Sequence, residues 1–292
     1  MSAGNSQPRD VRARIAALGN EIGPGSLEGA QALFDAEQRA LAKEIPAAAV
    51  DLPYGENARQ RLDVYRPAQG SGPLPVFVWV HGGGFLRGDK GDGERWPNAH
   101  AGRFAARAGF LGIVINYRLA PDHQWPSGGE DVGLVVDWLK ANGGEFGGDP
   151  NRIVLAGTSA GATHVATHIQ LRPDTPIQGA VLLSGLYGVE PYTDIRDLSY
   201  YGEDESLHAA RAPLHALVDT GVPLLVACSE FDPPRFQLEF VGLLRLRLDR
   251  QGRLPRAYIG SGHNHFSLAY HLGTSDTRLG DEIISFSREV AC

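Results

Sequence analysis

A serine lies between two glycines directly after an apolar run, in Gly157-Thr158-Ser159-Ala160-Gly161. The apolar run, which ends at residue 156, predicts a buried strand. A serine at a sharp strand-to-helix turn presents its hydroxyl above the sheet, where it can attack a carbonyl carbon. Glycine suits both ends of such a turn, because a Cβ there would collide with the neighbouring strand or helix. The pattern therefore predicts Ser159 as a nucleophile.

A cluster of three glycines follows another apolar run, in His81-Gly82-Gly83-Gly84-Phe85. Consecutive glycines let backbone N–H groups turn toward one point without side chains in the way. Such groups stabilise the negative charge that develops on a carbonyl oxygen under attack. The expected oxyanion donors are the backbone N–H groups of Gly83, Gly84 and Ala160. We expect His81 to brace this loop and not to react.

A serine hydroxyl also needs an adjacent base, and the base needs an acid that orients it. Two carboxylates, Glu230 and Asp232, follow the apolar run at residues 222–228. Two histidines, His263 and His265, follow the last expected strand. The residues alone leave both choices open.

The serine and glycine motifs together resemble the α/β-hydrolase fold. Residues 116–121, 125–131 and 148–153 narrow the resemblance to the hormone-sensitive-lipase-like carboxylesterases. In α/β-hydrolases the acid and then the histidine follow the serine along the chain. The resemblance implies Asp232 as the acid, because a proline follows it as in the family. It implies His265 as the base, because Phe266 follows it directly.

The resemblance covers about residues 60–270 and implies hydrolysis of carboxylic esters of short acyl or small aryl groups through an acyl-enzyme. One departure is the segment between the sixth and seventh strands, which is short for the large cap of the family. This short segment and the residues Gly88-Asp89-Lys90 are also similar to the smaller arylformamidase and feruloyl-esterase-like branches. An amide hydrolase such as an arylformamidase, with the same triad, is therefore the alternative. A lyase or a non-catalytic binding protein is less favoured.

Short apolar runs alternate with helical stretches, which predicts an α/β fold with a mostly parallel sheet flanked by helices. Strands are expected near residues 62–65, 76–80, 112–116, 153–156, 180–183, 224–227 and 257–259, and the first of them is expected to be antiparallel. Helices are expected near residues 97–108, 128–141, 160–170, 235–251 and 276–290. Residues 1–46 are expected to form an N-terminal helical segment, which either is a partial cap or packs on the sheet edge. Residues 47–292 are expected to form the hydrolase domain.

Aromatic residues on the expected active face predict a substrate pocket, with Phe85, Trp125 and Tyr187 as its walls. No charged residue stands out in these loops, so we expect a small neutral ester or amide substrate. His164 and His168 have the spacing of metal ligands on a helix, but packing is the favoured role because no third ligand lies nearby. No metal or other cofactor is expected. Asp131, at a helix start, is expected to cap or to brace a loop.

The composition excludes some partners. The chain of 292 residues has a net charge of −7 and no basic stripe, so neither nucleic acid nor a membrane surface is an expected partner. The N-terminus lacks a secretory pattern, and no apolar run could span a bilayer. Cys228 and Cys292 are not expected to pair, which favours a cytoplasmic location. The sequence leaves a homodimer open.

Overall fold

The computed structural model describes residues 5–68, 72–92 and 95–291. In this part of the chain, eight strands form one sheet in the order β1-β2-β4-β3-β5-β6-β7-β8. The pairs β1–β2 and β2–β4 are antiparallel, and the remaining pairs are parallel. The expected α/β class and the mostly parallel sheet are confirmed. The strand bounds are β1 (Ala47–Pro53), β2 (Arg61–Tyr65), β3 (Leu74–Val80), β4 (Leu111–Ile115), β5 (Gly148–Thr158), β6 (Gly179–Leu183), β7 (Leu224–Phe231) and β8 (Arg256–Asn264).

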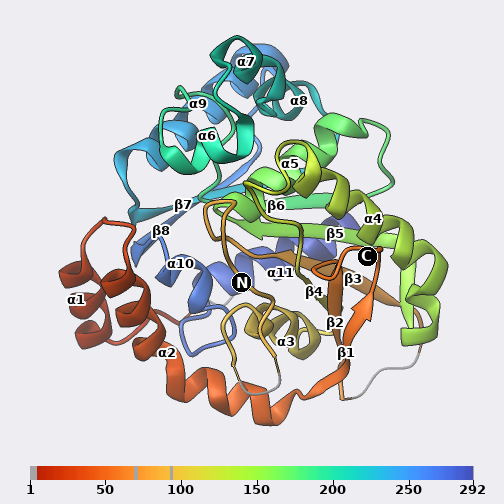
Figure 1. Cartoon of the computed structure of the whole chain (residues 1–292). Coiled ribbons are helices and arrows are strands. Elements are labelled where there is room, and N and C mark those ends of the chain that lie inside the picture. The colour runs from red at the N-terminus through yellow and green to blue at the C-terminus, as the bar shows by residue number, and fades with distance from the viewer. Residues whose placement is uncertain (1–4, 69–71, 93–94, 292) are drawn as a thin grey trace.

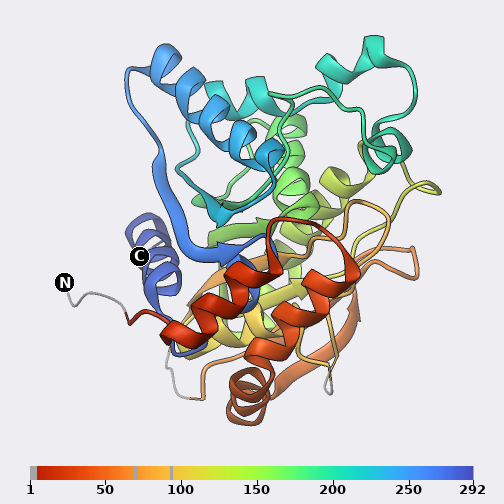
Figure 2. The ribbon, with the colours of Figure 1, turned by 90° about the vertical axis from the view of Figure 1, so that its left-hand side faces the viewer.

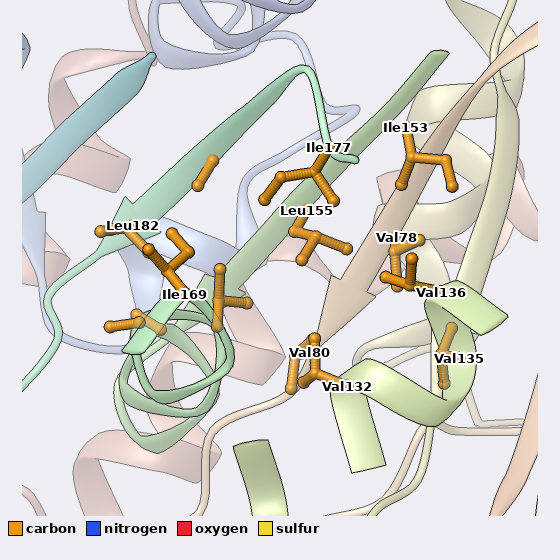
Figure 3. Packing of buried hydrophobic residues seen from close by; sticks show 14 of the residues in the cluster. Val78, Val80, Val132, Val135, Val136, Ile153, Leu155, Ile169, Ile177 and Leu182 are labelled. Atoms are coloured by element: carbon orange, nitrogen blue, oxygen red, sulfur yellow. The ribbon is translucent and has the colours of Figure 1, made fainter. Parts of the chain in front are cut away.

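Helices cover both faces of the sheet (Figure 1). Side chains alternate between the two faces along each strand. Val78 and Val80 therefore belong to one core cluster, whereas Phe77 and Trp79 belong to another. In the first cluster, β3 and β5 pack against Val132, Val135 and Val136 of α4 (Figure 3). The helices of this face are α4 (Ser127–Asn142), α5 (Ala160–Leu171), α8 (Leu214–Asp219) and α9 (Pro234–Gln251), and those of the other face are α3 (Ala99–Arg107), α10 (Ser267–Tyr270) and α11 (Arg278–Ala291).

Two helices precede the sheet, α1 (Arg9–Leu18) and α2 (Pro24–Glu44). Pro24 lies at the first helical position of α2, where its missing N–H costs nothing. One side of α2 is buried against the body through Ala30, Phe34, Gln38 and Leu41. Both helices lie across the face that is turned toward the viewer in Figure 2. The division at residue 46 stays a prediction.

The segment between β6 and β7, residues 184–223, folds into short helices at the top of Figure 1. They are α6 (Ile195–Tyr201), α7 (His208–Arg211) and α8, with a 3₁₀ turn, η2 (Glu205–Leu207), before α7. These helices were not predicted from the sequence. Within the described ranges, the structure contains no helix with the length and apolarity that crossing a membrane requires.

Candidate active site

Ser159 occupies a strained turn between β5 and α5. Its backbone has φ 53° and ψ −125°, a region that non-glycine residues rarely adopt. Its N–H donates to the carbonyl oxygen of Leu183 at 2.8 Å, which fixes the turn to β6. A Cβ on Gly161 would collide with the carbonyl oxygen of Val80, and one on Gly157 would collide with the backbone of Gly161. The expectation that only glycine fits at both ends of the turn is confirmed.

The expected oxyanion donors lie beside this serine. Gly83 and Gly84 have φ values of 140° and 59°, and Ala160 is the first residue of α5. Within the described part of the chain, none of these three N–H groups donates a hydrogen bond to another residue. All three residues line the same cavity as Ser159. The N–H groups are therefore free to bind an oxygen atom in that cavity.

Asp232 and His265 form a hydrogen-bonded pair. The Nδ1–H of His265 donates to Oδ1 of Asp232 at 2.7 Å, and both residues are buried. Nε2 is therefore the ring nitrogen left for Ser159, whose side chain lines the same cavity as His265. No hydrogen bond between Ser159 and His265 occurs among the described residues. Such bonds are often long in a free enzyme and tighten when substrate binds.

Ser184, which the sequence analysis missed, holds the other oxygen of Asp232. Its hydroxyl donates to Oδ2 at 2.6 Å, and the N–H of Ser229 donates to the same atom at 2.6 Å. Burial alone would raise the pKa of Asp232, but the hydrogen bonds from His265, Ser184 and Ser229 outweigh it and hold this pKa below its usual value. Asp232 therefore stays ionised and can stabilise a protonated His265.

The structure separates the two alternative residues from this pair. Glu230 is exposed and accepts hydrogen bonds from the N–H of Gly262 and from the Ser261 hydroxyl. His263 instead faces Asp276, with 3.2 Å between Nε2 and Oδ2. Of the four candidates, only Asp232 and His265 lie in contact with each other.

Ser159 and His265 line a cavity of about 1160 Å³. Phe85 lies in its wall and stacks on Tyr200 with ring centroids 4.5 Å apart. Trp125 and Tyr187 do not line it, so their expected pocket role is not supported by the geometry. Tyr187 is buried in the core under the sheet, and Trp125 packs beside the Phe85 cluster with Arg211 over its ring.

Comparisons with known proteins agree with this geometry. Residues 62–178 match the family model described as BD-FAE. The phenmedipham hydrolase of Pseudarthrobacter oxydans is 37% identical over 150 residues, which cover 49% of this chain and 29% of that protein. The carboxylesterase NlhH of Mycobacterium tuberculosis is 40% identical over 111 residues, which cover 38% of this chain and 34% of that protein. The chain thus matches about a third of the length of these relatives.

Solved structures match over nearly the whole chain. A hyperthermophilic esterase from the archaeon Pyrobaculum calidifontis superposes with a TM-score of 0.70 at 22% identity and covers 99% of this chain and 100% of its own. An arylesterase gives a TM-score of 0.69 at 20% identity, with the same coverage. The chain has the α/β-hydrolase fold. The resemblance to the esterases of this fold is confirmed.

The cavity also contains charged residues that were not predicted from the sequence. Arg196 and Arg235 line it, and they pair with Asp194 and Asp197 at 2.7 Å and 2.6 Å. No sequence pattern marks them, because α6 and the start of α9 meet only in the folded chain. One side of α2, with Leu27, Gln31 and Asp35, and the residues 20–22 before it form another wall.

The other residues that the sequence singled out have structural partners. His81 is buried and stacks on Tyr117 with ring centroids 4.3 Å apart. Asp131 accepts hydrogen bonds from the backbone N–H and the guanidinium of Arg118, as a loop brace does. His164 lies in the aromatic cluster around Tyr117, whereas His168 lies 2.7 Å from the Thr175 hydroxyl, so each has its own partner.

One buried group, His263, His271 and Asp276, could offer ligand atoms to a cation within 4.8 Å of one another. Arg278 already neutralises Asp276 at 2.7 Å, and the two imidazole rings stack with centroids 4.0 Å apart. A divalent ion there would add two buried charges without a counter-charge, which is costly. The cluster is better explained as a structural group, in which Asp276 forms an ion pair with Arg278 and a hydrogen bond with His263.

Proposed function

We propose that this α/β-hydrolase is a carboxylesterase that uses Ser159 as nucleophile, His265 as base and Asp232 as orienting acid. One observation carries the proposal. A strained serine, free N–H groups and a histidine already bonded to a buried carboxylate surround one cavity. The names of the relatives, carboxylesterase and phenmedipham hydrolase, support the same reaction class.

In this reaction Ser159 Oγ attacks the carbonyl carbon of the ester, and its proton passes to Nε2 of His265. The oxygen that becomes negative binds the N–H groups of Gly83, Gly84 and Ala160. His265 then gives its proton to the leaving alcohol, and an acyl-enzyme remains on Ser159. Water attacks this ester by the same route, and the products are a carboxylic acid and the free serine. Asp232 stabilises the imidazolium in both steps.

We propose a small neutral ester as the substrate. Arg196 and Arg235 of the cavity wall each have an aspartate partner, so these two pairs carry no net charge. Phe85 and Phe236 add apolar surface to the wall. An arylformamidase reaction would use the same residues and is the second outcome of the test below.

A panel of p-nitrophenyl esters, N-formylkynurenine and simple anilides tests the reaction class. Faster turnover of the esters supports the proposal, and preferential turnover of N-formylkynurenine favours the formamidase. An organophosphonate should label Ser159, as mass spectrometry can map. Full activity in Ser159→Ala, or a label on another residue, overturns the assignment.

We also propose a cytoplasmic location. A homodimer is a further proposal, which light scattering can test. Cys228 is buried. Cys292 lies outside the described residues, so the expected absence of a disulfide between the two stays a prediction.

A further inference from the structure

The N-terminal helices contact the part of the chain that carries His265. We call residues 262–272 the histidine loop. From this contact we infer that Gln38 of α2 is a positioning residue for His265, assisted by Gln7. The inference rests on the proposed role of His265 as the base.

Gln38 holds the end of the histidine loop. Its side chain is completely buried, and its Nε2 donates to the carbonyl oxygens of Tyr270 at 2.8 Å and Leu272 at 2.9 Å. Tyr270 is the last residue of α10. The last carbonyl groups of a helix accept no hydrogen bond from an N–H group of the same helix, so their partners must come from elsewhere. One side-chain amide, more than 230 positions away in sequence, supplies both hydrogen bonds.

Gln7 and Arg12 hold the beginning of the loop. The Nε2 of Gln7, which is also buried, donates to the carbonyl oxygen of Gly262 at 3.0 Å. Arg12 donates to the hydroxyl of Ser261 at 2.8 Å. Gly262 has φ 80°, which glycine adopts without strain. Glycine also adopts many other conformations, so this residue alone does not fix the path of the backbone. Contacts from the N-terminal segment thus add to the hydrogen bonds within the loop at both of its ends, and His265 lies between these ends.

The same helix also borders the cavity. Leu27, Gln31 and Asp35 of α2 line it, whereas Phe34 and Gln38 point into the body of the protein. A substrate in the cavity thus lies against the helix that holds the histidine loop. The N-terminal segment is then part of the catalytic arrangement and not only a cover over it.

Gln38→Met and Gln7→Met test this role, because methionine keeps the length of the side chain and removes both N–H donors. We expect kcat per active site for p-nitrophenyl butyrate to fall by 10- to 100-fold in Gln38→Met, since a misplacement of about 1 Å can cost about 100-fold. KM should change little, because the cavity wall is kept. The rate of Ser159 labelling by an organophosphonate should fall in parallel, since it depends on the same base.

Active-site titration separates misplacement from unfolding, because it counts the competent sites. The control Leu139→Ala removes core volume on the opposite face of the sheet. It should lower Tm and leave kcat per titrated site unchanged.

Wild-type kcat per site in Gln38→Met overturns the inference, and so does an equal loss in Leu139→Ala. If Gln38→Met does not fold, a wild-type kcat in Gln7→Met overturns it instead. A wild-type protein that cleaves no ester contradicts the proposed function itself, so the two failures are distinguishable.

Discussion

At the residue scale, the two carboxylate oxygens of Asp232 accept three hydrogen bonds. One comes from His265, and the other two come from Ser184 and Ser229. Asp232→Asn should fold, but its amide would favour the wrong tautomer of His265. We expect kcat to fall by about 10⁴-fold, as in other enzymes with a serine, histidine and aspartate. Glu230→Gln should keep most activity, because Glu230 does not contact His265 and the new amide oxygen can still accept the hydrogen bonds from Ser261 and Gly262. Steady-state kinetics of the two variants decide the assignment, and a crippled Glu230→Gln beside an active Asp232→Asn would reverse it.

The same reasoning separates the two histidines. His265→Ala should abolish turnover, because it removes the proposed base. His263→Ala should only weaken it, since His263 faces Asp276 and stacks on His271. The kcat values of the two alanine variants are the measurement. A dead His263 variant beside an active His265 variant would contradict the assignment.

Ser184 offers a test of how the acid is held. A hydrogen bond to a charged group contributes about 1.5–3 kcal/mol, so Ser184→Ala should lower kcat by about tenfold or more. The control is Ser229→Ala, because the buried Ser229 hydroxyl has no hydrogen-bond partner among the described residues while its N–H still reaches Asp232. Comparing kcat for both variants tests the role, and equal values would rule it out.

The sequence indicated Ser159, Asp232 and His265 because each follows an apolar strand and lies in a recognisable motif. Ser184 also follows a strand, but a lone serine after a strand has no such motif. Its contact with Asp232 exists only because β6 and β7 are neighbours in the sheet. Trp125 and Tyr187 were expected in the pocket for their aromatic character, which does not distinguish a cavity wall from a core.

At the scale of elements, runs that are buried on both faces were the most predictable, as in β3 and β6. β1 was not assigned, because all of its residues are exposed or half-exposed and its sequence, AAAVDLP, shows no alternation of apolar and polar residues. Helices α6, α7 and α8 were missed for another reason. Helices of four to seven residues are not stable by themselves and form through contacts in the folded protein.

A buried carboxylate holds the segment that leads to these short helices. Glu239 of α9 accepts hydrogen bonds from the backbone N–H groups of residues 187–190, at 2.9–3.2 Å. Glu239→Gln places an amide N–H₂ against one or more of these donors. We expect the free energy of unfolding to fall by about 1–3 kcal/mol, the cost of an unsatisfied buried group. Urea unfolding measures it.

The control for Glu239 is Asp249→Asn, which removes an exposed ion pair with Arg245 on the same helix. Such pairs contribute only a few tenths of a kcal/mol, up to about 0.5 kcal/mol. If the two variants unfold at the same urea concentration, the brace at residues 187–190 contributes little to stability.

At the scale of the whole molecule, buried histidines should make the fold sensitive to acid. Burial lowers the pKa of several of them far below the ordinary value of 6.5, to about 4 or about 3. Those with a pKa of about 4 are His81, His100 and His168, and those with a pKa of about 3 are His164 and His271. They lie on both sides of the sheet, so the effect belongs to the molecule and not to one element.

The sign of the effect follows from proton binding. Between the folded and the unfolded pKa values, the unfolded chain binds more protons, so the free energy of unfolding falls as the pH falls below about 6.5. For His164 alone the loss between pH 7.5 and pH 5 should be about 2 kcal/mol, at 1.36 kcal/mol per pH unit. The stability that these neutral histidines contribute is therefore present above pH 6.5 and is lost as the pH falls toward 4, or toward 3 for His164 and His271.

His164→Phe isolates one such group, because it keeps an aromatic ring among Phe85, Tyr117 and Tyr200 and removes the titratable nitrogen atoms. The variant cannot take up a proton at this position, so its free energy of unfolding should fall less steeply with acid than that of the wild type. Urea unfolding at pH 7.5 and pH 5 measures both slopes. His215→Gln, at an exposed position, should keep the wild-type slope. Parallel slopes for His164→Phe and the wild type would show that His164 is not the source of the acid sensitivity.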